Sequence, residues 1–566
     1  MLDHTRFDNL KDLDCAAALV IAICVFTIMN AFSVLAYDSK ASGPNDIYRS
    51  VTKGQPYVVS GQKASFFRNG EKWSILGANM PSMEKYAEPK DWPVKGLRYE
   101  VLAVTDPIND DKILPKTRTL RNVVNSQRIL VRACRGEYEP ASFVIRTGDI
   151  KLEDVRIHAT DLRSTNRGGS KRVETIGSRN LDIRVVKPWY QAGESRRTNK
   201  DGILVPEPEM LVKSKTLTPE LLLHDDKFVQ PNHLFQVNVV RDYKTTDDKE
   251  KVQSFDCEEQ SNKQVWITLK VPENTKPGEY EGIITVKPRN AKETKLRLSL
   301  VVFPFELEAP KLYYTLYYLN TLQVSKNHGL PHFKKKSTVH KDFRDIRSHG
   351  INNVIISHRR LDFTILKEIL DIKDSAGLDK TALFFTAWPK LATDYESLMR
   401  LRSDVEGVVR FARLRGIQKV YYYGVDELKS ALLPLEKPML KTIHDSGALT
   451  MTATDRSFFG IIDDMLDLVV FRGPPPQDVI EGVHKRNNKI WIYGNPQGGE
   501  EKPSVYRYNY GYLLWKLNVD GAAIYAYQCE MGEDPWDDFD HKKYRDHMLT
   551  YPTVNGNIPT IQWEGL

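Results

Sequence analysis

Two patterns of apolar and polar residues account for most of the chain, and the first extends over residues 126–310. Short segments there alternate apolar and polar positions, which is the period of a half-buried β-strand. No helical period separates them, and turns rich in Pro and Gly, such as residues 272–282, join them. The pattern predicts a β-sandwich that packs against its neighbour, with strands at residues 128–148, 180–190, 234–243, 265–272, 280–288 and 296–307.

The second pattern begins at residue 311, where short runs of β-branched or aromatic residues alternate with amphipathic stretches of helical period. One of these stretches, residues 395–416, ends in Gly416, a residue typical of a helix C-terminus. Eight runs occur, at residues 312–320, 352–358, 381–388, 419–427, 448–455, 466–471, 489–496 and 521–528. Eight strands alternating with helices predict a (β/α)8 barrel of the TIM type over residues 311–566. An open doubly wound sheet is the alternative, although no Gly-rich phosphate loop follows the first run.

The N-terminal segment, residues 1–37, follows neither pattern. Residues 15–37 carry no charge and are numerous enough to cross a bilayer as a helix, and residues 34–36 offer small side chains for a signal peptidase. We therefore expect residues 1–36 to be a signal peptide or a membrane anchor, with a buried core helix as the third possibility. Either main reading makes the rest of the chain secreted, periplasmic or anchored outside the membrane. Residues 37–125 are expected to form a linker and early strands.

Composition and charge narrow the function classes. Charged residues make up 27% of the 566 residues and the formal net charge is only +7, with no dense basic stripe, so nucleic acid is not an expected partner. The five cysteines form no CxxC or Cys/His cluster, and carboxylates and histidines are scattered. We expect neither a metal nor another cofactor. Membrane contact is expected only through residues 15–37, if they are retained.

Active sites of TIM barrels lie where the strands end, so the ends of the eight runs supply the candidate residues. They offer carboxylates, amides and many aromatic rings, which suits sugars because hydroxyl groups need polar partners and C–H faces stack on rings. The candidates for binding a carbohydrate are Trp388, Tyr423, Tyr493, Asn495, Tyr525, Tyr527 and Trp536.

The adjacent carboxylates Asp426 and Glu427 close the fourth run and are the candidate catalytic residues. Neighbours on a strand point to opposite sides, so the two are expected to do different work. A retaining glycosidase of the usual kind needs a second carboxylate, yet the seventh run ends in Tyr493-Gly494-Asn495-Pro496. Substrate-assisted hydrolysis fits better: Glu427 acts as acid and then base, while Asp426 orients a substrate acetamido group. Asp455 and Glu530 are the alternative second carboxylates, and a solvated loop is the plainest reading of the pair.

Several segments resemble motifs of glycoside hydrolase family 123 and its relatives, over roughly residues 128–564. In the first half they are RGEYEPASFVIR (135–146), PELLLHDD (219–226) and VPENTKPGEYEGIITV (271–286). In the second half they are HGINNV (349–354), YYYGVDE (421–427), LLWKLNVDGAAIYAYQ (513–528) and YPTVNGNIPTIQWE (551–564).

This resemblance implies an exo-acting β-N-acetylgalactosaminidase with a β-sandwich ahead of a (β/α)8 barrel. By position it implies that Asp426 stabilises an oxazoline and that Glu427 is the acid/base. The family's chains continue past the last shared motif into a helix, so we expect that helix to be missing here or replaced by residues 542–548.

Three functions remain open from the sequence. The first is an exported or anchored β-N-acetylhexosaminidase with a preference for the galacto sugar and an N-acetylhexosamine-containing glycan as its partner. The second is a glycosidase of another specificity, in which Glu427 works with Asp455 or Glu530. The third is a non-catalytic surface protein that only binds glycans at the barrel mouth.

Overall fold

The computed structural model describes residues 58–60, 63–68, 70–76, 96, 98–165, 173–192, 196–198, 204–206, 215–307, 310–322, 333–358, 361–494, 496–499, 501–541 and 545–566. Residues 1–36, expected to be a signal or anchor, lie outside this range, as does about half of residues 37–125. Among the described helices, none has both the length and the apolar character needed to cross a membrane.

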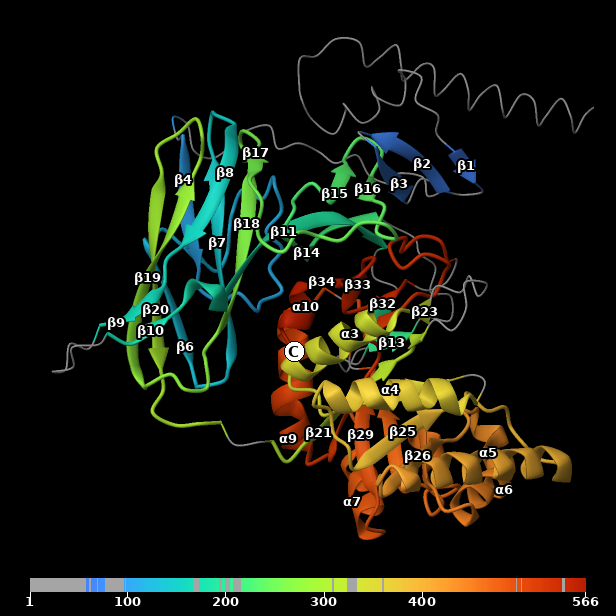
Figure 1. Cartoon of the computed structure of the whole chain (residues 1–566). Coiled ribbons are helices and arrows are strands. Elements are labelled where there is room, and N and C mark those ends of the chain that lie inside the picture. Colours follow the sequence, from blue (N-terminus) through green and yellow to red (C-terminus); the bar gives the residue numbers. More distant parts are fainter. Residues whose placement is uncertain are drawn as a thin grey trace, which may run out of the picture.

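A β-sandwich forms the first large unit, and it stands on the left in Figure 1. Its six-stranded sheet runs in the order β14 (Lys215–Leu223), β11 (Leu181–Ala192), β18 (Asn262–Lys270), β7 (Tyr138–Thr147), β4 (Tyr99–Val104) and β5 (Val123–Val124). The facing sheet runs in the order β10 (Thr175–Ile176), β9 (Leu162–Ser164), β19 (Gly278–Lys287), β20 (Thr294–Val302) and β6 (Arg128–Ala133), with β8 (Leu152–Ala159) on β19 and β17 (Phe255–Cys257) on β8. Apolar residues from alternate positions of both sheets make one core, including Phe143, Val265, Ile284 and Leu298.

Two boundaries of this unit differ from the sequence prediction. Strands β4 and β5 precede residue 126, yet they pair with β7 and so belong to the sandwich. The predicted strand at residues 234–243 belongs to a separate five-stranded sheet instead. That sheet runs in the order β1 (Val58–Ser60), β2 (Lys63–Arg68), β3 (Glu71–Leu76), β16 (Val237–Arg241) and β15 (Val229–Asn232).

The second large unit is a closed parallel barrel, which confirms the prediction from the eight runs. Its strands are β21 (Tyr313–Tyr318), β24 (Asn353–Ser357), β25 (Ala382–Thr386), β26 (Lys419–Tyr423), β27 (Leu449–Thr454), β28 (Leu468–Arg472), β29 (Lys489–Tyr493) and β30 (Gly521–Ile524). Alternate residues of each strand face in or out: Tyr423 joins the inner cluster, whereas Tyr422 packs against the surrounding helices.

Helices cover the outside of the barrel, at the lower right of Figure 1. They are α3 (Lys336–Ser348), α4 (Phe363–Ser375), α5 (Tyr395–Leu414), α6 (Leu433–Asp445), α7 (Gln477–Lys485), α8 (Pro503–Arg507) and α9 (Leu513–Leu517), with a π-helical turn (Tyr508–Tyr512) between the last two. Asp394 caps α5 by accepting from the Ser397 N–H at 2.9 Å, and Gly416 follows the helix with φ of +77°. Between β27 and β28 the connection holds only a 3₁₀ turn, Arg456–Phe458.

The chain after β30 lies between the two units, where the C-terminus is marked in Figure 1. Its elements are β31 (Gln528–Cys529), β32 (His547–Met548), β33 (Thr550–Pro552), β34 (Asn557–Pro559) and α10 (Ile561–Glu564). The described part of the segment 542–548 therefore contains a short strand and no helix, contrary to the expectation that it replaces a terminal helix. Two further pairs are small: β12 (Arg196–Thr198) with β13 (Leu204–Pro206), and β22 (Thr321–Leu322) with β23 (Phe333–Lys334).

Candidate active site

Asp426 and Glu427 lie on a tight turn that follows β26, at the carboxyl end of the barrel strands. Strand β26 ends at Tyr423, so the argument that the two carboxylates alternate along a strand is wrong. Instead, Glu427 has a left-handed backbone, with φ of +44°, and its N–H donates to the Ala453 carbonyl at 3.1 Å. A left-handed glutamate costs conformational energy, and such strain concentrates at functional sites.

Helix α6 supports this turn from behind through Glu436. One oxygen of its buried carboxyl group accepts from the Val425 N–H at 2.8 Å, and burial raises the pKa of Glu436 to about 7. Thr452 donates to the Val425 carbonyl at 2.7 Å from the other side. Gly424 is needed here because a Cβ atom would lie 2.6 Å from the Glu436 carboxyl oxygen. The turn is therefore fixed on both sides before any substrate arrives.

Asp426 is held by a pair of buried tyrosines. The Tyr423 hydroxyl donates to Asp426 Oδ1 at 2.9 Å and accepts from the Ala453 N–H at 3.0 Å. Because Tyr423 has one proton to give, the Tyr317 hydroxyl at 2.7 Å must donate to it. Part of Asp426 is exposed to solvent, but protein atoms surround its carboxyl group. Their desolvating effect raises the pKa of Asp426 to about 6. The charge of Glu427 adds to this shift, and the Tyr423 hydrogen bond opposes it.

Glu427 has a different set of partners. The Tyr493 hydroxyl donates to its Oε1, and Arg472 Nη1 lies 3.5 Å from its Oε2. The other terminal nitrogen of Arg472 lies 3.4 Å from Asp455. The Glu427 side chain remains 42% exposed, so one face is open to a substrate. The two adjacent carboxylates therefore have separate hydrogen-bond and ion-pair partners, as two different chemical roles require.

Two further aromatic candidates border the same turn. Trp388 follows β25 with φ of +51°, donates its indole N–H to Ser357 at 2.6 Å, and has its ring centroid 5.9 Å from that of Tyr423. Tyr525 follows β30, and its ring lies 5.2 Å from that of Tyr317. Both are only partly buried, so their rings can reach a ligand, whereas Tyr423 and Tyr493 are buried and act on the carboxylates.

Two candidates named from the sequence do not lie at the mouth. Tyr527 is fully buried behind the barrel wall, where its hydroxyl donates to Asp345 at 2.7 Å. Trp536 is 1% exposed and packs its ring 5.6 Å from Trp189 of the sandwich. Neither ring can stack on a sugar, because protein covers it. Asn495 lies outside the described residues.

The alternative carboxylates have contrasting surroundings. Asp455 caps the 3₁₀ turn after β27 by accepting from the Ser457 N–H at 2.8 Å. Burial opposes the shift, but that hydrogen bond and the charge of Arg472 lower the pKa of Asp455. Glu530 is half-buried, and burial raises its pKa to about 7. Asp455 is thus suited to orient Arg472, whereas Glu530 is neither fully protonated nor fully ionised near neutral pH.

Sequence reasoning gave no role to three residues of this site. Arg472 ends the sixth strand, but nothing in the sequence distinguishes it from other arginines near strand ends. Tyr317 lies inside the first run, and it could be identified only by knowing which alternate residues of that strand face the inside of the barrel. Glu436 lies on a helix and carries no sequence signal beyond a carboxylate on the apolar face. Among the described residues, no three His, Cys, Asp or Glu side chains gather as metal ligands do.

Comparisons with known proteins agree with this architecture. Residues 211–288 match the family model described as the glycoside hydrolase 123 N-terminal domain. A family 123 glycoside hydrolase from Clostridium perfringens, studied for glycolipid glycan hydrolysis, superposes with a TM-score of 0.58 at 15% identity, covering 83% of this chain and 86% of its own. A family 39 glycoside hydrolase from Bacteroides cellulosilyticus reaches only 0.31 at 12% identity, covering 54% and 73%. A search of curated proteins found no match. The domain match and the shared fold confirm the resemblance to family 123 and support a glycoside hydrolase.

Proposed function

We propose that the chain is an exo-acting β-N-acetylgalactosaminidase or hexosaminidase that retains anomeric configuration through the substrate's own 2-acetamido group. The observation that carries this proposal is the pairing at one turn: Asp426 is anchored by Tyr423, and Glu427 beside it by Tyr493 and Arg472. Tyr493 occupies the end of the seventh strand, where retaining glycosidases of the usual kind often place a nucleophilic carboxylate. Here that position supports the acid instead, so the nucleophile is better sought in the substrate.

The geometry supports the following sequence of steps. Glu427 donates its proton to the glycosidic oxygen while the acetamido carbonyl oxygen attacks the anomeric carbon, which breaks the glycosidic bond and closes an oxazoline ring. Asp426, as a carboxylate, accepts a hydrogen bond from the acetamido N–H and stabilises the positive charge that develops there. Glu427 then takes a proton from water, whose oxygen attacks the anomeric carbon and reopens the ring. Trp388 and Tyr525 offer the partly exposed rings beside this position.

The relative from Clostridium perfringens was studied for glycolipid glycan hydrolysis, which supports a glycan as the substrate here. The proposed mechanism requires that this glycan carry an N-acetylhexosamine. The apolar stretch at residues 15–37 supports an extracytoplasmic location, either secreted, periplasmic or anchored, where such glycans occur.

The test uses the full-length chain with 4-nitrophenyl β-GalNAc, β-GlcNAc, β-galactoside and β-glucoside, each with and without a thiazoline inhibitor. We expect cleavage of β-GalNAc that the thiazoline blocks. Glu427→Gln should lower kcat by about 10²- to 10⁴-fold, the usual contribution of general acid–base catalysis. Asp426→Asn should lose most on the acetamido sugars, while Glu396→Gln, at an exposed carboxylate on α5, serves as the control.

Other outcomes point to the competing functions. Cleavage confined to the non-acetamido sugars, insensitive to thiazoline, would replace this mechanism with one in which Glu427 works with Asp455 or Glu530. A folded chain that binds glycans without turnover, unaffected by Glu427→Gln, would leave a non-catalytic binding protein.

A further inference from the structure

A second polar cavity lies far from the barrel mouth, between the five-stranded sheet and the sandwich. Its volume is about 560 Å³, within the range of sites that hold small molecules. Strands β2 and β3 line one side, and β11 and β18 line the other, so no barrel residue contributes to it. The cavity contains the end of the PELLLHDD segment, which the proposed chemistry does not use.

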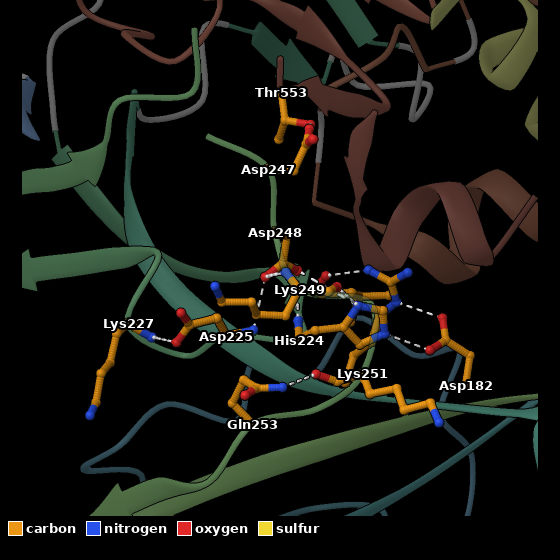
Figure 2. Close-up of polar contacts among 12 residues, drawn as sticks. Asp182, His224, Asp225, Lys227, Asp247, Asp248, Lys249, Lys251, Gln253 and Thr553 are labelled. Atoms are coloured by element: carbon orange, nitrogen blue, oxygen red, sulfur yellow. Dashed lines mark hydrogen bonds and ion pairs between the residues drawn. The ribbon is translucent and has the colours of Figure 1, made fainter. Parts of the chain in front are cut away.

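Near the end of that segment, His224 and Asp225 are each hydrogen-bonded to other parts of the protein (Figure 2). His224 Nε2 lies 2.6 Å from Asp182, and its Nδ1 lies 2.5 Å from the Lys249 carbonyl oxygen. Asp225 accepts from the Arg241 guanidinium at 3.0 Å. These contacts hold the loop that carries Lys249 against the end of β14, and the last residue of the segment, Asp226, lines the cavity.

Asp226 is shared by two lysines. The Lys187 ammonium lies 3.0 Å from one oxygen, and the Lys263 ammonium lies 3.0 Å from each oxygen. Their side chains are only 9% and 17% exposed. One carboxylate cannot balance two ammonium groups, and a buried charge without a counter-charge is costly. In keeping with that cost, burial lowers the pKa of Lys187 to about 8, with the charge of Lys263 acting in the same direction.

The nearby carboxylates reduce this surplus without removing it from the cavity. Glu258, the next acid beside Lys263, shares Lys151 with Asp256, at 3.0 and 3.5 Å. Arg241 is likewise shared by Asp225, at 3.0 Å, and Glu71, at 3.2 Å. Two more cations, Arg68 and Lys227, line the cavity and make no ion pair within the described structure. Six cationic side chains therefore line the cavity against four carboxylates, so it carries more positive than negative charge. Lys187 and Lys263 are more buried than Lys151, the third lysine held in an ion pair there.

We propose that this cavity binds an anionic sugar unit, with its carboxylate or sulfate group seated against Lys187 and Lys263. A single inorganic anion would fill only a small part of the volume, whereas a monosaccharide with an acidic group matches both its size and its charge. The sugar identity rests on the proposed function, since a glycan-active chain meets such units on its substrates. The charge imbalance itself stands independently of that function.

The test is isothermal titration of the full-length chain at low ionic strength with D-glucuronic acid and with N-acetylgalactosamine 6-sulfate. Neutral N-acetylgalactosamine and inorganic sulfate are the comparison ligands. We expect saturable binding of at least one acidic sugar, at least tenfold weaker in Lys187→Met and in Lys263→Met. Lys276→Met is the matched control, because Lys276 is an exposed lysine elsewhere on the sandwich, 71% exposed and paired with Glu174.

Three results would overturn the proposal: no binding of either acidic sugar, binding that both lysine variants retain, or sulfate binding as tight as that of the sugars. Thermal unfolding separates lost binding from lost folding. Removing one surplus ammonium should leave the melting temperature unchanged or raise it, whereas Asp226→Asn should lower it by leaving two ammonium groups without a counter-charge. Because this is a binding measurement, it fails or succeeds separately from turnover of 4-nitrophenyl β-GalNAc.

Discussion

Replacing Tyr423 with phenylalanine should move the acid limb of the pH–rate profile. The Tyr423 hydroxyl donates to the Asp426 carboxylate at 2.9 Å and so opposes the rise in the Asp426 pKa to about 6. A hydrogen bond to a charged group is worth about 1.5–3 kcal/mol. At 1.36 kcal/mol per pKa unit, its loss should raise the Asp426 pKa by about one to two units, to roughly 7–8.

The proposed mechanism needs Asp426 as a carboxylate, so the variant should lose most activity at low pH. At pH 6 the wild type is about half ionised at this residue, and the variant should be about five- to fiftyfold slower in kcat/KM. Near pH 9 the ratio of the two rates should approach one. Stopped assays with 4-nitrophenyl β-GalNAc across pH 5–9 measure this, with Tyr421→Phe as the control from the same strand. An acid limb that stays in place while the rate falls equally at every pH would refute the reasoning.

Two predictions concern the support of the turn that carries Asp426 and Glu427. Burial raises the pKa of Glu436 from its usual 4.5 to about 7, so the stability that its neutral carboxyl contributes is fully present below pH 4.5 and is lost as the pH rises through 7. Urea unfolding should therefore show the wild type losing about 3 kcal/mol between pH 5 and pH 9 relative to Glu436→Gln, and parallel curves would contradict this. Gly424→Ala should lower kcat and cost about 1–3 kcal/mol, because its Cβ atom would lie 2.6 Å from the Glu436 carboxyl oxygen. Wild-type kcat in that variant would show that the turn tolerates displacement.

The barrel was predictable because its strands are buried on both faces and separated by helices, which makes each one a short apolar run in the sequence. The eight runs therefore gave the strands to within a few residues. The sandwich boundary at residue 126 was less accurate, since β4 and β5 acquire their place only by pairing with β7. Likewise, the strand at residues 234–243 has the right period for the sandwich, but its pairing with β3 decides its sheet.

The same limit applies to the candidate site. Strand ends identified Asp426, Glu427 and Trp388, because the carboxyl end of a barrel strand is fixed by topology alone. The same rule named Tyr527 and Trp536, whose burial depends on chain segments that return from elsewhere. For residues that follow a strand end, the direction of the side chain depends on tertiary packing, which the local sequence pattern does not predict.

The sandwich is connected to the candidate site through the chain that follows β30. The Ala192 N–H at the end of β11 donates to Asp538 at 2.8 Å, and Asp538 also accepts from the Asp546 N–H at 2.6 Å. Asp546 in turn accepts from the Met531 N–H at 2.7 Å. These bonds fix the backbone two residues beyond Cys529, whose sulfur lies 3.2 Å from the Tyr525 hydroxyl at the mouth. These contacts, joined by the backbone between Cys529 and Met531, connect the end of β11 to an aromatic ring of the candidate site. The barrel closes through its own strands, and the chain that follows its eighth strand is bonded to the sandwich, so the two units form one body.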